Sequence, residues 1–205
     1  ASLFTGHHSF VHEATHAEDI NVHSYPLDEH YITLAELLSS KGYITGAVTA
    51  NRVFLTPWFG LNQGFQYYWW GRSRNDVLVF KKMLPLLLDD KSFENIRKIC
   101  GISAVNSSRR INQIAIDWLK KQRNHPFFLF LNYMESHGID YLPPPYSKMF
   151  THYPAPSWPP RSRENGTPVV SGKEFERIRS WYDNELAFLD NQIGLFLNQQ
   201  PFSSW

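Results

Sequence analysis

Several features that often reveal the class of a protein are scarce or missing in this 205-residue sequence. Its single cysteine, Cys100, has no second cysteine in the chain to pair with, so no internal disulfide framework holds the fold. No run of about 18 apolar residues occurs, so no membrane span is expected within these residues. The net charge is only +1, which gives no electrostatic reason to expect nucleic acid or an anionic membrane as a partner.

The sequence also lacks the features of a natural amino terminus. It begins with Ala1 instead of methionine, and no charged start is followed by an apolar signal stretch. We therefore expect an internal segment of a longer protein, with any targeting signal upstream of Ala1. The sequence carries no signal for a compartment or an oligomeric state.

What is present is enough for one domain with a sizeable core. Hydrophobic residues make up 42% of the sequence and aromatic residues 16%, so the core or a ligand surface is rich in rings. Residues 43–49 (YITGAVT) and 127–131 (FFLFL) are rich in β-branched or large apolar residues and are predicted to be strands. The second run shows no alternation, which is typical of a strand covered on both faces in a parallel sheet.

Helices are predicted between and after these strands. Thr33 and Glu36 form a capping box at the start of a helix that Gly42 ends. Further helices are expected at 76–88, 107–121 and 173–198, and irregular loops at 51–71 and 138–170. The last helix carries apolar residues spaced by threes and fours: Phe175, Ile178, Tyr182, Leu186, Leu189, Ile193 and Leu197. The alternation predicts an α/β fold with a mostly parallel central sheet flanked by helices.

Polar residues follow both predicted strands. Asn51 comes after the first strand, and Glu135 and His137 come after the second. Because ligands of open α/β sheets bind beyond the carboxyl ends of strands, Asn51 and His137 are candidates for one site if the strands are parallel neighbours. His137 can donate a hydrogen bond to an anionic oxygen or protonate a leaving group. Alternatively, it only ties down the proline-rich loop that follows. Glu135 is interpreted as an exposed loop carboxylate.

Two other clusters allow a functional and a structural interpretation. His7, His8, His12 and His16 crowd the amino end, but their spacing matches no standard zinc motif, so we favour a role without metal. The aromatic stretch at 66–70 has rings that can stack on sugars, although rings in such a run more often pack in the core.

Five blocks of the sequence, in order, resemble the sulfatase family. The family's C/S-x-P-S-R-A-S-L-x-T-G segment is similar, after its nucleophile, to residues 1–6. The other similar blocks are T-L-A-E-L-L-x-x-x-G-Y-x-T at 33–45, G-L-x-x-G-F at 60–65, F-F-L-F-L-x-Y-x-x-x-H at 127–137 with P-P-x-Y at 143–146, and Y-D-x-E-[IL]-x-x-x-D-x-x-I-G at 182–194.

The resemblance implies an alkaline-phosphatase-like sandwich, with residues 1–205 forming part of a single catalytic domain that continues at both ends. It implies a sulfuric ester hydrolase that acts on a small-molecule or carbohydrate sulfate ester. The family uses a formylglycine nucleophile and a calcium-type cation, and hard oxygen ligands suit that ion. Both groups are expected to be supplied outside this chain. No metal ligand is therefore assigned within it, and the isolated chain is expected to be inactive.

The resemblance assigns roles to two residues. His137 stands where a family histidine contacts the sulfate group, so it is the candidate catalytic and substrate-binding histidine. Asn51 stands where many members carry lysine; its amide can hydrogen-bond an oxyanion but brings no charge. Cys100 is no substitute nucleophile, because the residues around it lack the proline and arginine of the modification signal.

Two alternatives remain open within this sequence. Phosphomonoester, phosphodiester and phosphonate hydrolases share much of the same frame. A catalytically inactive relative that binds sulfated or carbohydrate ligands is the third hypothesis, motivated by Asn51 and the aromatic stretch at 66–70. The nucleophile and the aspartates in the flanking sequence distinguish the three.

Overall fold

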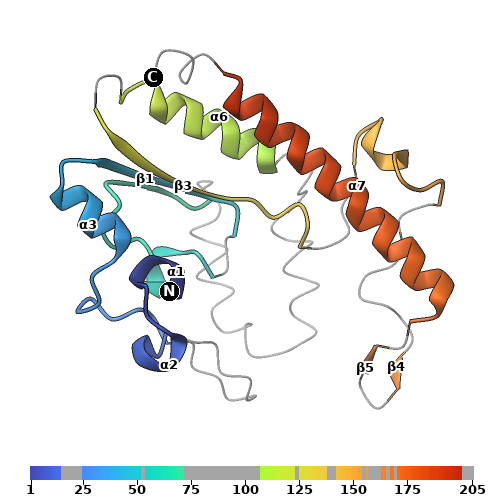
Figure 1. The fold of residues 1–205 in the computed structure, drawn as a ribbon, viewed down its shortest axis with the longest axis horizontal. Helices are drawn as coiled ribbons and strands as arrows, with labels where there is room; N and C mark the ends of the chain where they lie inside the picture. The colour runs from blue at the N-terminus through green and yellow to red at the C-terminus, as the bar shows by residue number, and fades with distance from the viewer. Residues whose placement is uncertain are drawn as a thin grey trace. The chain divides into compact units, whose positions relative to one another are not determined.

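Three parallel strands form a sheet in the order β2-β1-β3. β1 (Ile44–Thr49) lies between β2 (Tyr67–Trp69) and β3 (Phe127–Asn132) and runs parallel to both, as Figure 1 shows for β1 and β3. The register places Ile44 opposite Phe127 and Gly46 opposite Tyr67. The predicted parallel sheet of an α/β fold is therefore confirmed.

The structure is a computed structural model that describes residues 1–14, 25–51, 54–71, 107–122, 125–137, 142–153, 156, 163–164, 167–168 and 170–199. The chain divides into two compact units, Ala1–Ile102 with Trp118–Asn132 and Ser103–Asp117 with Tyr133–Trp205. The sheet belongs to the first unit. The helix predicted at 76–88, as well as Cys100 and His16, lie outside the described residues.

β1 forms the core of the first unit. Every residue of the strand after Ile44 is buried, as expected for a central strand between two neighbours. A Cβ atom at Gly46 would lie 2.7 Å from Cζ2 of Trp118. Gly46 is therefore the residue that lets the Trp118 ring lie directly against the backbone of β1.

The helix before β1 begins and ends where the sequence predicts. α3 (Leu34–Ser40) carries the capping box: Thr33 Oγ1 accepts from the Glu36 N–H at 3.2 Å, and Glu36 Oε2 accepts from the Thr33 N–H at 2.8 Å. Gly42 follows the helix with φ +85, a backbone conformation that favours glycine. α3 contacts β1, so the local signals place a helix against the central strand.

The segment between β1 and β2 is more ordered than predicted. Residues 51–71 were expected to be an irregular loop, but they contain the short 3-10 helix η1 (Pro57–Phe59) and the strand β2. Thr45 of β1 holds the entry to β2, because its Oγ1 donates to the Gly64 carbonyl at 2.6 Å and accepts from the Gln66 N–H at 3.1 Å. The strand thus depends on a tertiary contact, which no local pattern announces.

β3 departs from the prediction in its cover. The strand was expected to be buried on both faces, yet each of its residues is only half-buried. Among the described strands β3 lies at an edge of the sheet, with β1 as its one neighbour. The predicted parallel pairing is confirmed, whereas the prediction that both faces of the strand are buried is wrong.

Two short helices precede the sheet in the chain. α1 (Ser2–Thr5) and α2 (Ser9–His12) are each only one turn long. Phe4 of α1 packs edge-on against Phe130 of β3, with ring centroids 4.9 Å apart, and against Phe65 at 5.6 Å. These contacts fix α1 on the sheet.

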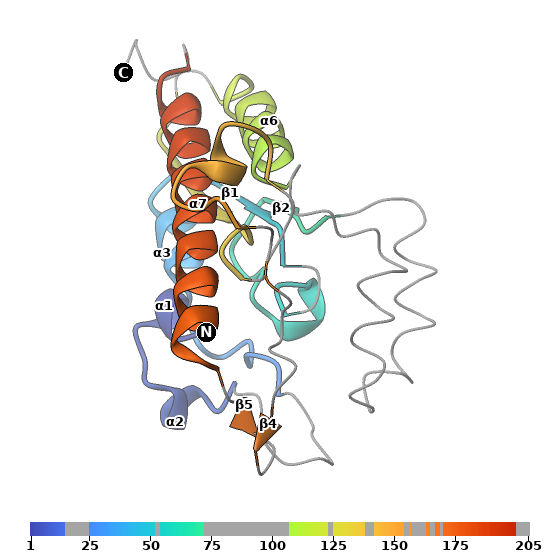
Figure 2. The ribbon, with the colours of Figure 1, turned by 90° about the vertical axis from the view of Figure 1, so that its right-hand side faces the viewer.

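The second unit is built around one long helix. α7 (Gly172–Leu197) begins at Ser171, whose side chain accepts from the Glu174 N–H, and Figure 2 shows it as one continuous helix. The predicted helix is confirmed. Its buried face, however, comprises Trp181, Asn184, Glu185, Phe188, Gln192 and Phe196. Of the apolar residues named from the sequence, four are exposed: Phe175, Tyr182, Leu186 and Leu197.

Helix α6 and the proline-rich loop complete the described elements. α6 (Ser107–Leu119) confirms the predicted helix, and its apolar residues Ile111, Ala115 and Leu119, spaced by fours, are buried. The loop predicted at 138–170 is not wholly irregular. It contains the 3-10 helix η3 (Tyr146–Lys148), which contacts α7, and a two-stranded antiparallel ribbon of β4 (Arg163–Glu164) and β5 (Thr167–Pro168). No helix among the described residues has the length and apolar character to cross a membrane.

Candidate functional site

Asn51 lies just beyond the carboxyl end of β1, where the neighbouring strand fixes its position. Its backbone N–H donates to Asn132 Oδ1 at 3.1 Å, and the Ala50 N–H donates to the Asn132 carbonyl at 3.0 Å. The side-chain oxygen of Asn51 accepts from the Phe54 N–H at 2.8 Å. The side-chain group of Asn51 that can donate to an anionic oxygen is Nδ2, because an amide oxygen only accepts.

His137 follows β3 by five residues and belongs to the second unit. Its imidazole is exposed, and the backbone N–H of His137 donates to the Met134 carbonyl at 3.0 Å, which closes a turn. Asn51 belongs to the first unit, so the surroundings of each candidate are described within its own unit. Exposure at a strand end suits a side chain that contacts a substrate.

Glu135 overturns the interpretation drawn from the sequence. It was interpreted as an exposed loop carboxylate, but it is only 2% exposed. Its Oε1 accepts from the Ser108 N–H at 2.6 Å, in the first turn of α6, and its Oε2 accepts from the Met134 N–H at 3.2 Å. Hydrogen bonds of this kind compensate the cost of burying a carboxylate.

Tyr133 makes a second contact between α6 and the segment that follows β3. Its hydroxyl donates to Asn112 Oδ1 at 2.6 Å, and Asn112 Nδ2 donates to the Gln192 carbonyl at 2.8 Å. Burial, with a smaller contribution from the charge of Glu135, raises the pKa of Tyr133 well above its ordinary value. The hydroxyl therefore stays protonated and acts as a donor at neutral pH.

At the amino end, His12 joins α1 to α2. It is 4% exposed, its Nδ1 accepts from the Ala14 N–H at 3.0 Å, and its Nε2 lies 2.8 Å from Ser2 Oγ. A neutral imidazole whose Nδ1 is an acceptor carries its proton on Nε2. We therefore assign the neutral Nε2–H tautomer, in which His12 donates to Ser2 and is no base for it.

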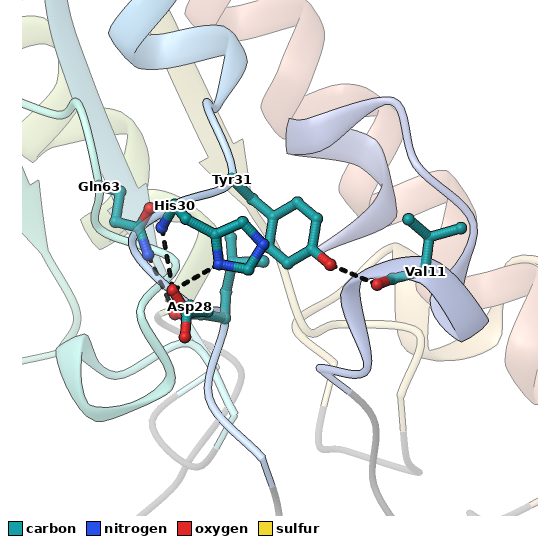
Figure 3. A network of polar contacts seen from close by, with 6 residues as sticks. Val11, Asp28, His30, Tyr31 and Gln63 are labelled. Atoms are coloured by element: carbon teal, nitrogen blue, oxygen red, sulfur yellow. Dashed lines mark hydrogen bonds and ion pairs between the residues drawn. The ribbon is translucent and has the colours of Figure 1, made fainter.

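A second contact ties α2 to the segment before α3. Figure 3 shows the Tyr31 hydroxyl donating to the Val11 carbonyl. Nearby, the His30 N–H and ring Nδ1 lie 3.0 and 2.7 Å from Asp28 Oδ1 (Figure 3), and these two hydrogen bonds lower the pKa of Asp28. Gln63 Nε2 donates to the Leu27 carbonyl at 3.0 Å. The described residues just before α3 thus contact α2 through Tyr31 and the residues before β2 through Leu27.

The state of His12 predicts how pH affects stability. Burial lowers the pKa of His12 below its ordinary value of 6.5, so the unfolded chain binds more protons than the folded one near pH 6. The stabilisation from neutral His12 is complete above about pH 6.5 and is lost as the pH falls through the folded pKa. Its slope cannot exceed about 1.4 kcal/mol per pH unit.

We expect His12→Gln to reduce the fall in thermal midpoint between about pH 7.5 and pH 5. Glutamine has no group that titrates in this range, so the difference between variant and wild type isolates the imidazole. Thermal unfolding followed by circular dichroism at several pH values measures it. Identical pH dependence in both proteins would contradict the lowered pKa of His12.

The described residues do not gather a metal site. Among them, no three histidine, cysteine, aspartate or glutamate side chains lie close enough together to hold a metal ion. His7 and His12 contact the ring of Tyr31, and His8 stacks on Phe10, with ring centroids 5.4 Å apart. The described carboxylates therefore do not fit a calcium-type cation, and no chemical step is assigned through one here.

The aromatic stretch at 66–70 packs against protein groups. The Tyr67 ring stacks on Trp118, with centroids 6.2 Å apart and planes 26° apart. The Tyr68 hydroxyl donates to the Leu55 carbonyl at 3.0 Å, and burial raises the pKa of Tyr68 to about 12. These contacts favour the structural interpretation of Tyr67 and Tyr68 over a sugar platform.

The sequence pointed to the residues expected to contact substrate. It did not point to the residues that support them from behind. Nothing local marked Glu135 as buried or Tyr133 as bound to α6, because their partners Ser108 and Asn112 precede them by more than 20 residues. His12 had a signal in its cluster of histidines, but that cluster was weighed only as a possible metal site.

A solved structure has a fold similar to that of this chain. A phosphonate monoester hydrolase of Agrobacterium radiobacter is similar, with a TM-score of 0.61 and 16% sequence identity over 99% of this chain and 49% of that chain. The chain thus spans about half the length of that hydrolase. At this identity the likeness concerns the α/β fold alone. None of the proteins with curated descriptions matches the sequence.

The family comparison extends over almost the whole sequence. Residues 1–200 match the family model described as Sulfatase. This range includes the segment around α1, the capped helix α3, all three strands of the sheet and the whole of α7. The chain therefore belongs to the sulfatase family.

Proposed function

We propose that the protein containing this chain hydrolyses sulfate esters, with a small molecule or a carbohydrate as the esterified group. The observation that carries the proposal is the match of residues 1–200 to the Sulfatase family. Two local features support it. A polar residue follows each of the parallel neighbours β1 and β3, and α1 is fixed on β3 through Phe4.

The family resemblance implies a formylglycine nucleophile and a calcium-type cation, which we propose are supplied by residues outside this chain. Residues 1–205 then form part of one catalytic domain. Such a cation would supply charge neutralisation for the sulfate group. The described residues contribute hydrogen bonds and proton transfer instead.

Within this proposal His137 contacts the sulfate group and donates a hydrogen bond to its ester oxygen or protonates the leaving group. Asn51 donates a hydrogen bond from Nδ2 to a sulfate oxygen. Two contacts support this role: the one with Asn132 fixes the backbone of Asn51 at the end of β1, and the one with Phe54 orients its side-chain amide. An amide brings no positive charge, so the stabilisation of the developing charge at this position is weaker than lysine provides.

A phosphonate or phosphate ester is the second candidate substrate, favoured by the likeness to a phosphonate monoester hydrolase. Parallel assays of the full-length protein with 4-nitrophenyl sulfate and 4-nitrophenyl phenylphosphonate decide between the two. We expect the larger kcat/KM with the sulfate. A preference for the phosphonate would move the assignment to phosphorus, and saturable binding of both esters without turnover would favour an inactive relative.

The isolated 205-residue chain is expected to show no calcium-dependent hydrolysis of 4-nitrophenyl sulfate. It has no formylglycine signal at Cys100, and its described residues gather no cation ligands. A direct comparison with the full-length protein, with and without added calcium, measures this. Calcium-dependent turnover by the isolated chain would show that nucleophile and cation ligands lie within residues 1–205.

A further inference from the structure

Burial of the Glu135 carboxylate costs free energy, because the group loses its hydration. Glu135 is 2% exposed, and a buried carboxylate is strongly destabilising unless hydrogen bonds replace the lost water. The Ser108 N–H and the Met134 N–H supply two such bonds, one to each oxygen, at 2.6 and 3.2 Å. Glu135 thereby connects the segment after β3 to the first turn of α6.

The electrostatics of this contact are favourable. Ser108 is the second residue of α6, so its N–H has no partner within the helix. The N-terminal end of a helix carries a partial positive charge, which attracts a carboxylate. Hydrogen bonds to an ionised acceptor are about twice as strong as neutral ones. The carboxylate is therefore better suited to this position than a neutral amide.

A second contact runs beside the first. Ser108 and Asn112 are four residues apart and share one face of α6. Glu135 binds the first of them, and Tyr133 donates to the second at 2.6 Å. Two alternate residues of the segment are thus held against two successive turns of the helix.

His137 lies at the end of the segment that these contacts hold. The His137 N–H donates to the Met134 carbonyl, and Glu135 is the first residue inside the turn that this bond closes. The same carboxylate accepts from the Met134 N–H, so it fixes both the turn and the place of the turn on α6. The His137 side chain itself remains exposed.

We propose that Glu135 is a positioning residue for His137: its carboxylate anchors the 134–137 turn on the N-terminus of α6 and so sets where the imidazole stands. This inference rests on the proposed role of His137 in ester hydrolysis. Glu135 does not touch the substrate. Its effect on catalysis passes entirely through His137, which makes it separable from a general effect on folding.

A double-mutant cycle in the full-length protein tests the proposal. Glu135→Gln keeps the size of the side chain but removes its charge and one acceptor. We expect it to lower kcat/KM for the preferred ester on the order of 10²-fold, as misplacement of a catalytic group by about 1 Å does. In the His137→Ala background the same change is expected to have no further effect. Equal losses in both backgrounds would overturn the proposal.

Matched variants separate positioning from folding. Glu176→Gln alters an exposed glutamate of α7 and is expected to leave kcat/KM unchanged. Ser108→Pro removes the N–H from which Glu135 accepts, and no hydrogen bond within the helix is lost, because the N–H groups of the first turn have no partner there. It is expected to reproduce the loss seen with Glu135→Gln, also only when His137 is present. Full activity of Ser108→Pro would contradict the anchor.

Hydrogen exchange decides the question even if the full-length protein hydrolyses no ester, an outcome that would sink the proposed function alone. In Glu135→Gln the amide of His137 is expected to exchange at least about tenfold faster, because the turn opens locally. The amide of Phe188, in the middle of α7, is expected to keep its wild-type rate. An unchanged rate at His137 would overturn the positioning role.

Discussion

Replacing Gly64 by alanine is expected to destabilise the protein by about 2–5 kcal/mol. Gly64 has φ +77, and a left-handed conformation costs an L-residue roughly 1–2 kcal/mol. A Cβ atom there would also lie 2.2 Å from the Glu36 nitrogen and 2.7 Å from the carbonyl carbon of Ala35. Because these are backbone atoms of the capped end of α3, the clash moves the helix and adds about 1–3 kcal/mol.

Gly42→Ala is the matched control. Gly42 also has a positive φ, +85, but nothing lies within 4 Å of the Cβ that alanine would add. It is expected to cost only the backbone strain, about 1–2 kcal/mol. Urea denaturation of both variants measures the difference. Equal losses would show that close packing against α3 contributes nothing at Gly64.

The reason for the size of this effect is the number of contacts that meet at the turn. Thr33 Oγ1 lies 3.1 Å from the Gln63 carbonyl, and Thr45 Oγ1 donates to the Gly64 carbonyl. The turn therefore joins the start of α3 to β1 and directs the chain into β2. A shift at Gly64 disturbs all three elements at once.

In the full-length protein, His137→Ala is expected to lower kcat/KM on the order of 10²–10⁴-fold, the usual contribution of a general acid or base. The thermal midpoint is expected to change little, because the imidazole is exposed. Steady-state kinetics with the preferred ester, together with thermal unfolding, measures both quantities.

His125→Ala is the control for His137→Ala. His125 is also an exposed histidine, but it precedes β3 at the amino end of the strand. Since ligands bind beyond carboxyl ends, its removal is expected to leave kcat/KM unchanged. Comparable losses in the two variants would contradict the assignment of the substrate site to the carboxyl end of β3.

The elements that the sequence predicted correctly are those with local causes. The capping box of α3 needs only Thr33 and Glu36, three residues apart, and β1 follows from a run of β-branched and small apolar residues. α6 follows from the spacing of Ile111, Ala115 and Leu119. Each signal lies within a few turns of one helix or within one strand. The local preference and the tertiary packing agree there, so the sequence alone is sufficient.

The elements that were missed depend on distant partners. β2 has three residues, too few for a strand signal, and Thr45 of β1 holds its entry. The buried face of α7 includes Asn184, which accepts from the Phe150 N–H, so a polar residue lies where the apolar pattern predicted none. At the site, the sequence placed Asn51 and His137 at strand ends but gave no sign that Glu135 would cap α6.

The most direct test of the central claim is to determine the sequence preceding Ala1 in the full-length protein and the mass of the peptide that contains it. We predict a C/S-x-P-S-R tract joined to Ala1, with its cysteine or serine converted to the aldehyde formylglycine. That result would make the protein a formylglycine sulfatase. A threonine or unmodified serine outside this tract, or no nucleophile at all, would contradict the assignment.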